Sequence, residues 1–384
     1  MADLYCTKSE VVLTKSNVIL TIPQPKQFEL VERPFPKAES GYVIVKNEYA
    51  AVCLEGTRVW TKHDFETFES GAQSDYPDGL GHESVGTVEY APRGSSLRQG
   101  DRVVIFQGDW CGQCHACHNA LSPTYCDANL HPKEGQTRVA MAGIQDINGS
   151  ASGGWAMAQY RIAHEVHCYK IPDSLDFKHA QAANCSVGVG WSNQELMNVK
   201  AGDTVLVGGI GFIALGHIIS ALHRNATVIA LIRNPYRKAI LEKMGVEHYV
   251  DPGDDDWLEQ VKALTYNGQG VDHSVECSGH PYYQEKCMAA TRLYGTVNFS
   301  GHTPGAKLEF SPLHSVTHPG HTLLGQHDVR MRDREGLVRC LMSPAVQKMV
   351  DAMVTHVYPM SKADEAFDMQ VSKQCGKIFL QPQL

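Results

Sequence analysis

The chain has 384 residues, of which 43% are hydrophobic and 20% are charged, and its formal net charge is -8. This length is enough for two domains, and the composition is that of a globular protein. The acidic balance and the lack of any basic run argue against nucleic acid as the partner.

The chain contains twelve cysteines, and its first residues, MADLYCTKSE, do not have the pattern of a signal peptide. We therefore expect reduced thiols in a cytoplasmic protein, with metal binding as the use of the clustered ones. The apolar segment 205–219 contains four glycines. At about 15 residues it is shorter than the roughly 18 to 20 that a membrane span needs, so we expect a buried strand followed by a helix there, and no membrane partner.

The part of the chain up to about residue 168 consists of short alternating segments interrupted by Gly and Pro, such as 42–46, 84–90 and 101–106. Apolar residues at every second position predict strands with one buried face. This part is therefore expected to form an antiparallel sheet or a partly closed barrel.

A second set of soft metal ligands is scattered along the chain. Cys53 follows a strand-like segment, His82 and Glu83 follow Gly81, and Cys185 lies in AANCSVGVGW. Two thiolates and one imidazole are typical of a catalytic zinc site, which keeps its fourth position open, and Glu83 could support it or exchange as a ligand. Each cysteine is equally compatible with a small buried hydrophobic residue, because ligands this far apart cannot be paired without a fold.

Four cysteines crowd into the segment CGQCHACHNALSPTYC, at Cys111, Cys114, Cys117 and Cys126. Gaps of two residues allow tight turns to bring the flanking sulfurs onto one tetrahedral Zn²⁺. This spacing predicts a structural zinc site, with His115 and His118 as a minor alternative source of ligands. We expect the remaining cysteines to be structural or incidental: Cys6, Cys168, Cys277, Cys287, Cys340 and Cys375.

From residue 201 onward, apolar strand-like segments alternate with helical ones, which predicts a parallel sheet with helices on both faces. The first strand–helix turn reads Gly209-Ile-Gly211-Phe-Ile-Ala214 and fits G-x-G-x-x-G/A. In such a loop the glycines permit a tight turn and a close backbone approach to a pyrophosphate. We therefore expect a dinucleotide cofactor here, although glycine-rich turns also occur for packing reasons.

The end of the following strand bears on which cofactor binds. No acidic residue, which would bind the ribose hydroxyls of NAD(H), occurs between positions 227 and 240. Arg233, Arg237 and Lys238 could instead receive a 2′-phosphate, or they could be solvated charges at the start of a helix. The pattern favours NADP(H) over NAD(H).

Taken together and in this order, the segments resemble the zinc-containing medium-chain alcohol dehydrogenase family over almost the whole chain. The segments that carry the resemblance are GHESVGTVEYAP with LRQGDRVV, the four-cysteine segment, GGIGFIA, VDHSVECSG, RLYGTVNFSGH and EAFDMQVSKQCGKIFL.

The resemblance implies an α/β fold with a GroES-like, mostly-β catalytic domain over 1–184 and 325–384. It also implies a structural zinc lobe near 111–126 in that domain and a Rossmann domain over 185–324. It implies one zinc held by Cys53, His82 and Cys185, with Glu83 adjacent, and a second held by the four clustered cysteines. The implied reaction is reversible hydride transfer between an alcohol and an aldehyde or ketone, in a homodimer or homotetramer.

The segment after Cys53 departs from the family pattern C-G-S/T-D-x-H. Aligned without gaps, Glu55 replaces the hydroxyl residue that relays the proton, and Arg58 replaces the histidine. Thr57 could supply a hydroxyl instead. The interval between Cys53 and His82 is also long, so the segment 60–80, with Phe65, Phe68 and Tyr76, is expected to shape the substrate pocket.

Two other functions remain open. The same fold could reduce an activated C=C bond without zinc, as in enoyl and quinone reductases, although Cys53 and Cys185 count against it. The chain could also be a non-catalytic zinc- and nucleotide-binding protein, for which Glu55 and Arg58 are the best support.

Overall fold

The computed structural model of the protein describes residues 15–38, 41–62, 80–108, 110–130, 155–301, 303 and 305–384, with only the backbone for 55, 62, 129 and 130. The chain forms two compact units. Unit 1 comprises Met1–Gln181, Val357–Val371 and Ile378–Leu384, and unit 2 comprises Ala182–His356 and Ser372–Lys377. No helix in the described ranges is both long enough and apolar enough to cross a membrane.

Unit 1 is built mainly from antiparallel strands. Its elements are β1 (Ser16–Gln24), β2 (Gln27–Pro34), β3 (Tyr42–Ala51), α1 (Leu54–Lys62), β4 (Ser84–Tyr90), β5 (Arg102–Ile105), α2 (His115–His118), η2 (Pro123–Tyr125), α3 (Asp127–Leu130), β6 (Tyr160–His164), η3 (Glu165–His167), β7 (Cys168–Lys170), α4 (Phe177–Gln181) and η7 (Met360–Lys362). Three further elements continue across a unit boundary along the chain: β14 (Val354–Pro359), α12 (Ala363–Ser372) and β15 (Lys377–Gln381).

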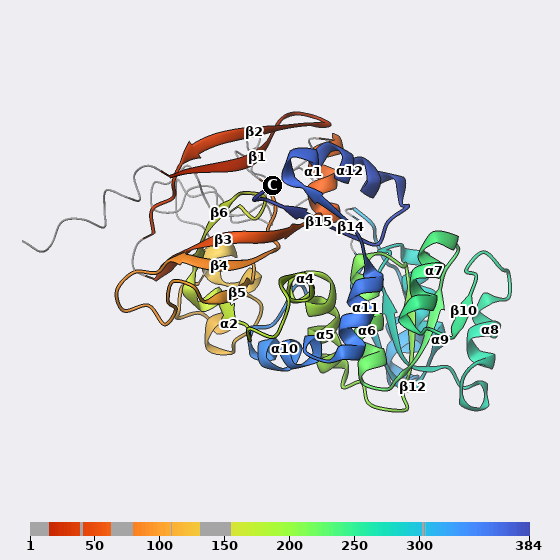
Figure 1. The fold of residues 1–384 in the computed structure, drawn as a ribbon. Coiled ribbons are helices and arrows are strands. Elements are labelled where there is room, and N and C mark those ends of the chain that lie inside the picture. The colour runs from red at the N-terminus through yellow and green to blue at the C-terminus, as the bar shows by residue number, and fades with distance from the viewer. Residues whose placement is uncertain are drawn as a thin grey trace, which may run out of the picture. The chain divides into compact units, whose positions relative to one another are not determined.

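The main sheet of unit 1 contains the strand order β15-β3-β4-β5-β7, with β6 also paired to β3 (Figure 1). Every described pairing among these strands is antiparallel. Val43, Val45, Val88 and Val103 are buried in one core cluster, as the period-two pattern predicts for strands with an inner face. The predicted antiparallel architecture is confirmed.

Unit 2 alternates strands and helices. Its elements are α5 (Ser186–Met197), β8 (Thr204–Gly208), α6 (Phe212–His223), β9 (Thr227–Leu231), α7 (Pro235–Met244), β10 (His248–Val250), α8 (Trp257–Ala263), η4 (Tyr266–Gly268), β11 (Val271–Glu276), α9 (Pro281–Ala290), β12 (Thr291–Phe299), η5 (Leu313–Thr317), β13 (Thr322–Leu324), η6 (Met331–Asp333), α10 (Arg334–Leu341) and α11 (Pro344–Met353).

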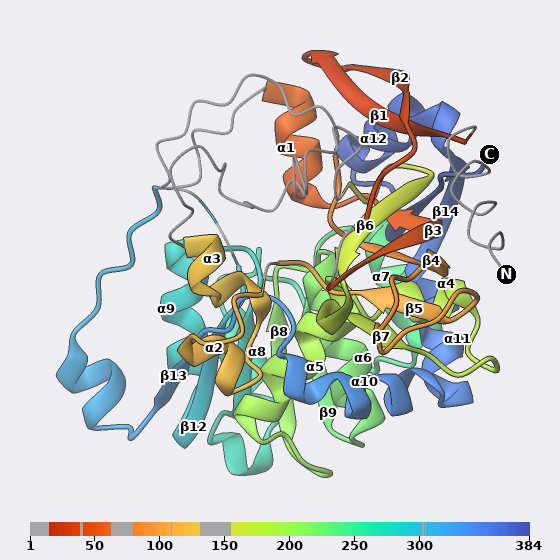
Figure 2. The same cartoon turned by 90° about the vertical axis from the view of Figure 1, so that its left-hand side faces the viewer.

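The sheet of unit 2 is parallel throughout, in the order β10-β9-β8-β11-β12-β13. Figure 2 labels four of its strands, β8, β9, β12 and β13. From β8 the chain adds β9 and then β10 on one side of that strand. It then returns to the other side of β8, where it adds β11, β12 and β13 in turn. Because such crossovers are right-handed, α6 and α9 cover opposite faces of the sheet. This order places a topological switch point between β8 and β11, where doubly wound proteins bind their ligands.

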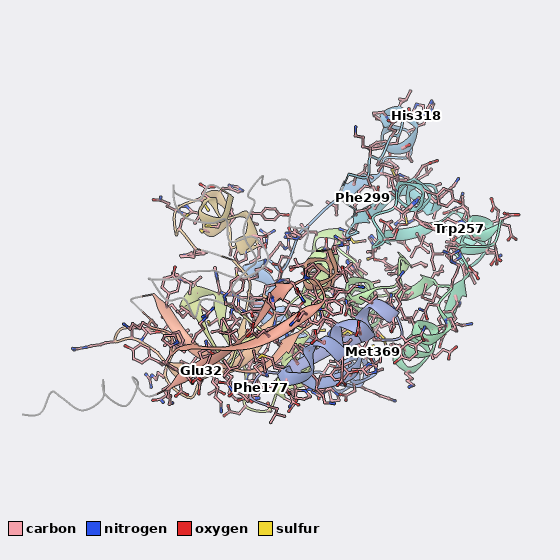
Figure 3. All side chains as sticks on the ribbon, turned by 90° about the horizontal axis from the view of Figure 1, so that it is seen from above. Glu32, Phe177, Trp257, Phe299, His318 and Met369 are labelled. Carbon is pink, nitrogen blue, oxygen red and sulfur yellow. The ribbon has the colours of Figure 1, made fainter. Side chains whose placement is uncertain are left out.

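One core of unit 2 lies between the sheet and the helices α8 and α9. Trp257 is buried there with Leu206, Ile229 and Val297, and Phe299 packs against the cluster (Figure 3). On the other side, α5 and α6 pack closely because Gly216 has no side chain. A Cβ at Gly216 would lie 1.8 Å from the carbonyl oxygen of Ser186, which no substitution could relieve without moving backbone.

The return to unit 1 differs from the sequence-based boundary. Residues 325–356 were expected in the catalytic domain, whereas the chain leaves unit 2 only after His356. The reason is that α10 packs on α5, and α11 packs on α6 and α7. At the other boundary the two divisions differ by three residues, with a switch at 181 in place of 184.

Candidate functional site

Four thiols converge in the segment that contains α2 and η2. The Sγ atom of Cys117 lies 4.0 Å from that of Cys111, 3.5 Å from that of Cys114 and 3.7 Å from that of Cys126. Four sulfurs at about 2.3 Å from a tetrahedral zinc are separated by about 3.8 Å, so the group fits one zinc ion. His115 and His118 are exposed, and the grouped ligand atoms are the four thiols alone.

The thiols of this cluster differ in acidity. Burial acts to raise the pKa of Cys114, but hydrogen bonds from the backbone N–H groups of Asp127 and Cys117 outweigh it and lower the pKa to about 6. Burial raises the pKa of Cys126 far above its usual value. A metal would replace this mixture of charged and neutral thiols with four thiolates, since only the deprotonated sulfur is a ligand.

A second group of ligand atoms lies at one end of the main sheet in unit 1. Cys53 follows the end of β3, and His82 and Glu83 immediately precede β4. The two strands are paired so that Ala50 lies opposite Ser84, which brings the segments beyond them together. Potential ligand atoms of Cys53, His82 and Glu83 all lie within 4.8 Å of one another, and His82 Nε2 lies 3.8 Å from Glu83 Oε1.

Two members of this second group are well shielded from water, and Cys53 is half-buried. His82 is 8% exposed and Glu83 is 1% exposed. The backbone N–H of Ala51 donates to the carbonyl of Glu83 at 3.2 Å, which ties the two segments directly. A sulfur, an imidazole and a carboxylate in a buried cluster are chemically suited to a divalent transition metal such as zinc.

The residues considered for proton relay lie on α1. The buried Thr57 hydroxyl donates to the carbonyl of Cys53 at 3.2 Å, so its proton is engaged within the helix. Glu55 lies in the same helix, but its side chain is outside the described part of the structure, as is most of the segment 60–80 with Phe65, Phe68 and Tyr76. Arg58 is half-buried.

Cys185 lies in unit 2, where it immediately precedes α5. Its side chain is half-buried and its sulfur is free of any disulfide. The residue follows the end of α4 by four positions.

The glycine-rich turn has the conformation that its sequence predicts. Gly209 follows β8 with φ of +75°, and a Cβ there would lie 2.5 Å from the backbone nitrogen of Ser278. Gly211 caps the start of α6, and Ala214 is fully buried within that helix. The free N–H groups at the start of α6 therefore face the switch point, which is the arrangement that binds a pyrophosphate.

The three basic residues after β9 have different surroundings. Arg233 is exposed, and no described carboxylate forms an ion pair with it. Arg237 is half-buried and donates from Nη1 to the carbonyl of Ile210 at 2.6 Å. Lys238 is exposed, with Nζ 5.0 Å from the ring centroid of Tyr249. Arg233 and Lys238 are therefore exposed, whereas Arg237 is engaged with the glycine-rich turn.

Comparison with known families matches both parts of the chain. Residues 39–173 match the alcohol dehydrogenase GroES-like domain, and residues 209–341 match the zinc-binding dehydrogenase domain. The chain belongs to the zinc-containing medium-chain alcohol dehydrogenase family. It is accordingly an oxidoreductase with a GroES-like domain and a nucleotide-binding domain.

Individual relatives of this alcohol dehydrogenase family member are distant but match along nearly the whole chain. A Catharanthus roseus protein described as "CYP enzymes assisting alcohol dehydrogenase" is 26% identical over 97% of this chain and 99% of its own. An S-(hydroxymethyl)glutathione dehydrogenase from Escherichia coli O6:H1 is 26% identical over 92% and 96%. The crystal structure of benzyl alcohol dehydrogenase from Acinetobacter calcoaceticus superposes with a TM-score of 0.80 at 20% identity, covering 96% of this chain and 99% of that one.

Among the described residues of this dehydrogenase, four buried Arg, Lys or Glu residues were not singled out from the sequence: Arg161, Glu276, Arg330 and Lys377. The Glu276 carboxylate accepts the backbone N–H of Ser278 at 2.6 Å and that of Gly279 at 2.9 Å, and also the Ser278 hydroxyl. Burial raises the pKa of Glu276, against these hydrogen bonds. Lys377 Nζ lies 5.1 Å from the ring centroid of Phe212, the first residue of α6. These residues stand out because they are charged and buried, and burial cannot be read from their spacing in the sequence.

Proposed function

We propose that this protein is a zinc-dependent dehydrogenase that transfers hydride reversibly between an alcohol and an aldehyde or ketone, with NADP(H) favoured over NAD(H). The observation that carries the proposal is the group formed by half-buried Cys53 and buried His82 and Glu83, whose potential ligand atoms lie within 4.8 Å of one another. A reductase that works without zinc has no need of this donor set.

Cys185 is proposed as the third protein ligand, beside Cys53 and His82. It follows α4 by four residues, and α4 contacts β3 and β4, the strands that flank the group. The four-residue connection from α4 to Cys185 spans at most about 14 Å. Two thiolates and one imidazole would leave one position open, as in catalytic zinc sites.

Zinc bound there would supply Lewis-acid polarisation of an alcohol or carbonyl oxygen. The protein's own part is to hold the ligands and exclude water. Buried His82 and Glu83 provide a dry site, and the pairing of β3 with β4 fixes the spacing between Cys53 and His82. The proton relay is proposed to involve Glu55 or Thr57.

The cofactor site is proposed at the switch point of unit 2. Gly209, Gly211 and the start of α6 would receive the pyrophosphate through backbone N–H groups. Arg233 is exposed and without a described carboxylate partner, which supports a role in binding the 2′-phosphate of NADP(H). Arg237 is proposed to support the same site through the glycine-rich turn, and Lys238 to add positive charge nearby.

Substitution of Cys185 by Ala tests the function. We expect the variant to lose alcohol turnover by at least about a thousandfold while its affinity for the nicotinamide cofactor stays nearly unchanged. The matched control is Cys340→Ala, which alters a buried cysteine of α10. Assays should use primary, secondary and aromatic alcohols with both cofactors.

Two outcomes would contradict the proposal. Unchanged turnover in Cys185→Ala would remove this residue from the metal site. A metal content of about one zinc per chain in the wild-type protein, in place of about two, would favour the zinc-independent or non-catalytic alternatives.

The compartment and assembly are also proposals. No disulfide joins any of the eleven cysteines in the described residues, which supports a reducing compartment such as the cytoplasm. A homodimer or homotetramer is proposed from the family alone.

A further inference from the structure

Arg161 is a buried arginine that touches the backbone of a proposed metal ligand. It lies on β6, opposite Val45 of β3, and it is 4% exposed. Its Nη1 donates to the carbonyl of His82 at 2.9 Å and to the hydroxyl of Ser84 at 3.0 Å. Because His82 and Ser84 are the neighbours of Glu83 in the chain, the two contacts hold the segment that carries both His82 and Glu83.

The charge of Arg161 is unusual in this environment. Burial lowers the pKa of Arg161 to about 10, with the Cys168 thiol acting in the opposite direction, so the guanidinium remains charged at neutral pH. Among the described residues no carboxylate forms an ion pair with it, and its Nε has no hydrogen-bond partner. A buried charge is costly unless an opposite charge offsets it.

Hydrogen bonding alone does not explain a charged residue here. Donation to these two oxygens does not itself require a charge, because neutral side-chain groups also donate hydrogen bonds. The Cys168 thiol is one group that can offset the charge, and the ligand group, whose His82 backbone Arg161 contacts, is another. Thiolates of Cys53 and Cys185 together with ionised Glu83 carry one more negative charge than Zn²⁺ neutralises, which leaves the loaded site in need of a nearby cation.

We propose that Arg161 is a positioning residue whose buried positive charge stabilises the ionised ligand group around His82 and thereby raises the zinc affinity of this site. The inference rests on the proposed function and extends it to a residue outside the ligand set. Partners that orient metal ligands typically contribute about 10-fold to 100-fold to metal affinity.

The experiment compares Arg161→Gln, which keeps a donor and removes the charge, with Arg161→Lys, which keeps the charge. Ser84→Ala is the matched control because it removes one of the two acceptors and leaves the charge in place. Zinc affinity is measured for the full-length protein by competition with a chromophoric chelator at several pH values, and folding is checked by thermal unfolding. The four-thiol cluster in the same chain is the internal reference for zinc content.

We expect Arg161→Gln to bind zinc at the second site about tenfold or more weakly, and to need a higher pH for half-saturation. Arg161→Lys and Ser84→Ala should stay within about threefold of wild type. Equal losses in the Gln and Lys variants would show that only the guanidinium's shape matters, and unchanged affinity in Arg161→Gln would show no role for the charge. Either result overturns the proposal. If Arg161→Gln fails to fold, a Lys variant with zinc affinity about tenfold below wild type overturns it as well. Wild-type protein that binds only about one zinc would instead refute the proposed function itself.

Discussion

Arg237 reaches back from α7 to the glycine-rich turn, where its Nη1 donates to the carbonyl of Ile210 at 2.6 Å. Burial lowers the pKa of this guanidinium, and contact with the Cys375 thiol acts in the opposite direction. The side chain is therefore committed to the turn between Gly209 and Gly211. Arg233, four residues earlier, has no such commitment and is exposed. Two arginines that the sequence presents as equivalent thus have separate expected roles.

Substitution of the two arginines should separate those roles. Arg237→Met removes a hydrogen bond that shapes the turn, so we expect the affinities for NADP(H) and NAD(H) to fall together, by about tenfold. Arg233→Asp should change the ratio of kcat/KM for NADP(H) over NAD(H) by about tenfold or more in favour of NAD(H). Both effects are measured by steady-state kinetics with each cofactor. An unchanged ratio in Arg233→Asp would remove Arg233 from cofactor discrimination.

The four-thiol cluster should bind zinc and stabilise unit 1. Cys126→Ser removes a fully buried thiol from the group, so we expect the loss of about one zinc per chain and about 3 kcal/mol or more of unfolding free energy. Metal analysis and thermal unfolding measure the two effects. His118→Ala, which alters an exposed imidazole of the same segment, is the control and should leave both unchanged. A full zinc content in Cys126→Ser would contradict the assignment.

Glu276 should support the cofactor site through the turn that follows β11. Its carboxylate accepts three donors from Ser278 and Gly279, and Ser278 packs against Gly209. In Glu276→Gln the amide nitrogen would face a backbone N–H, so we expect a loss of about 1–3 kcal/mol in stability and weaker cofactor binding. Ser278→Ala removes one donor and should cost about 1 kcal/mol. Fluorescence titration with the cofactor and urea unfolding provide the measurements. Equal cofactor affinity in wild type and Glu276→Gln would argue against this role.

His217 should make folding sensitive to acid. It is fully buried in α6, its Nε2 lies 3.0 Å from the Ser300 hydroxyl, and burial lowers its pKa to about 3. The unfolded chain takes up a proton near pH 6.5, whereas the folded chain does so only near pH 3. The contribution of His217 to the free energy of unfolding is therefore complete above pH 6.5, and it is lost progressively as the pH falls toward 3.

The expected contribution of His217 to this loss is about 2 kcal/mol between pH 7 and pH 5. Urea unfolding at both pH values measures it in wild type and in His217→Gln. The variant should be less stable at pH 7 but should lose less on acidification. A variant whose pH dependence matches that of wild type would show that His217 does not titrate as expected.

Local patterns in the sequence were sufficient to predict the type of sheet in each unit. Alternating residues in β3 and β4 predicted an antiparallel sheet, and the apolar segments from residue 201 predicted a parallel one. The turn from Gly209 to Ala214 was predictable because a tight turn and a close contact with Ser278 both require glycine at a definite place. The boundary at 325 was not predictable, since the packing of α10 and α11 on unit 2 is a long-range contact.

The amino-acid sequence by itself determined the strand–helix order, the glycine-rich turn and the spacing of the four clustered thiols, because each depends on residues within about one turn or one strand of each other. Only the tertiary structure decided that Cys53 meets His82 and Glu83, that Arg161 is buried against His82, and that Arg237 serves the turn while Arg233 remains exposed. The physical reason is strand register. The pairing of Ala50 with Ser84 joins segments more than thirty positions apart. The sequence contains both residues, but it does not show that they are paired.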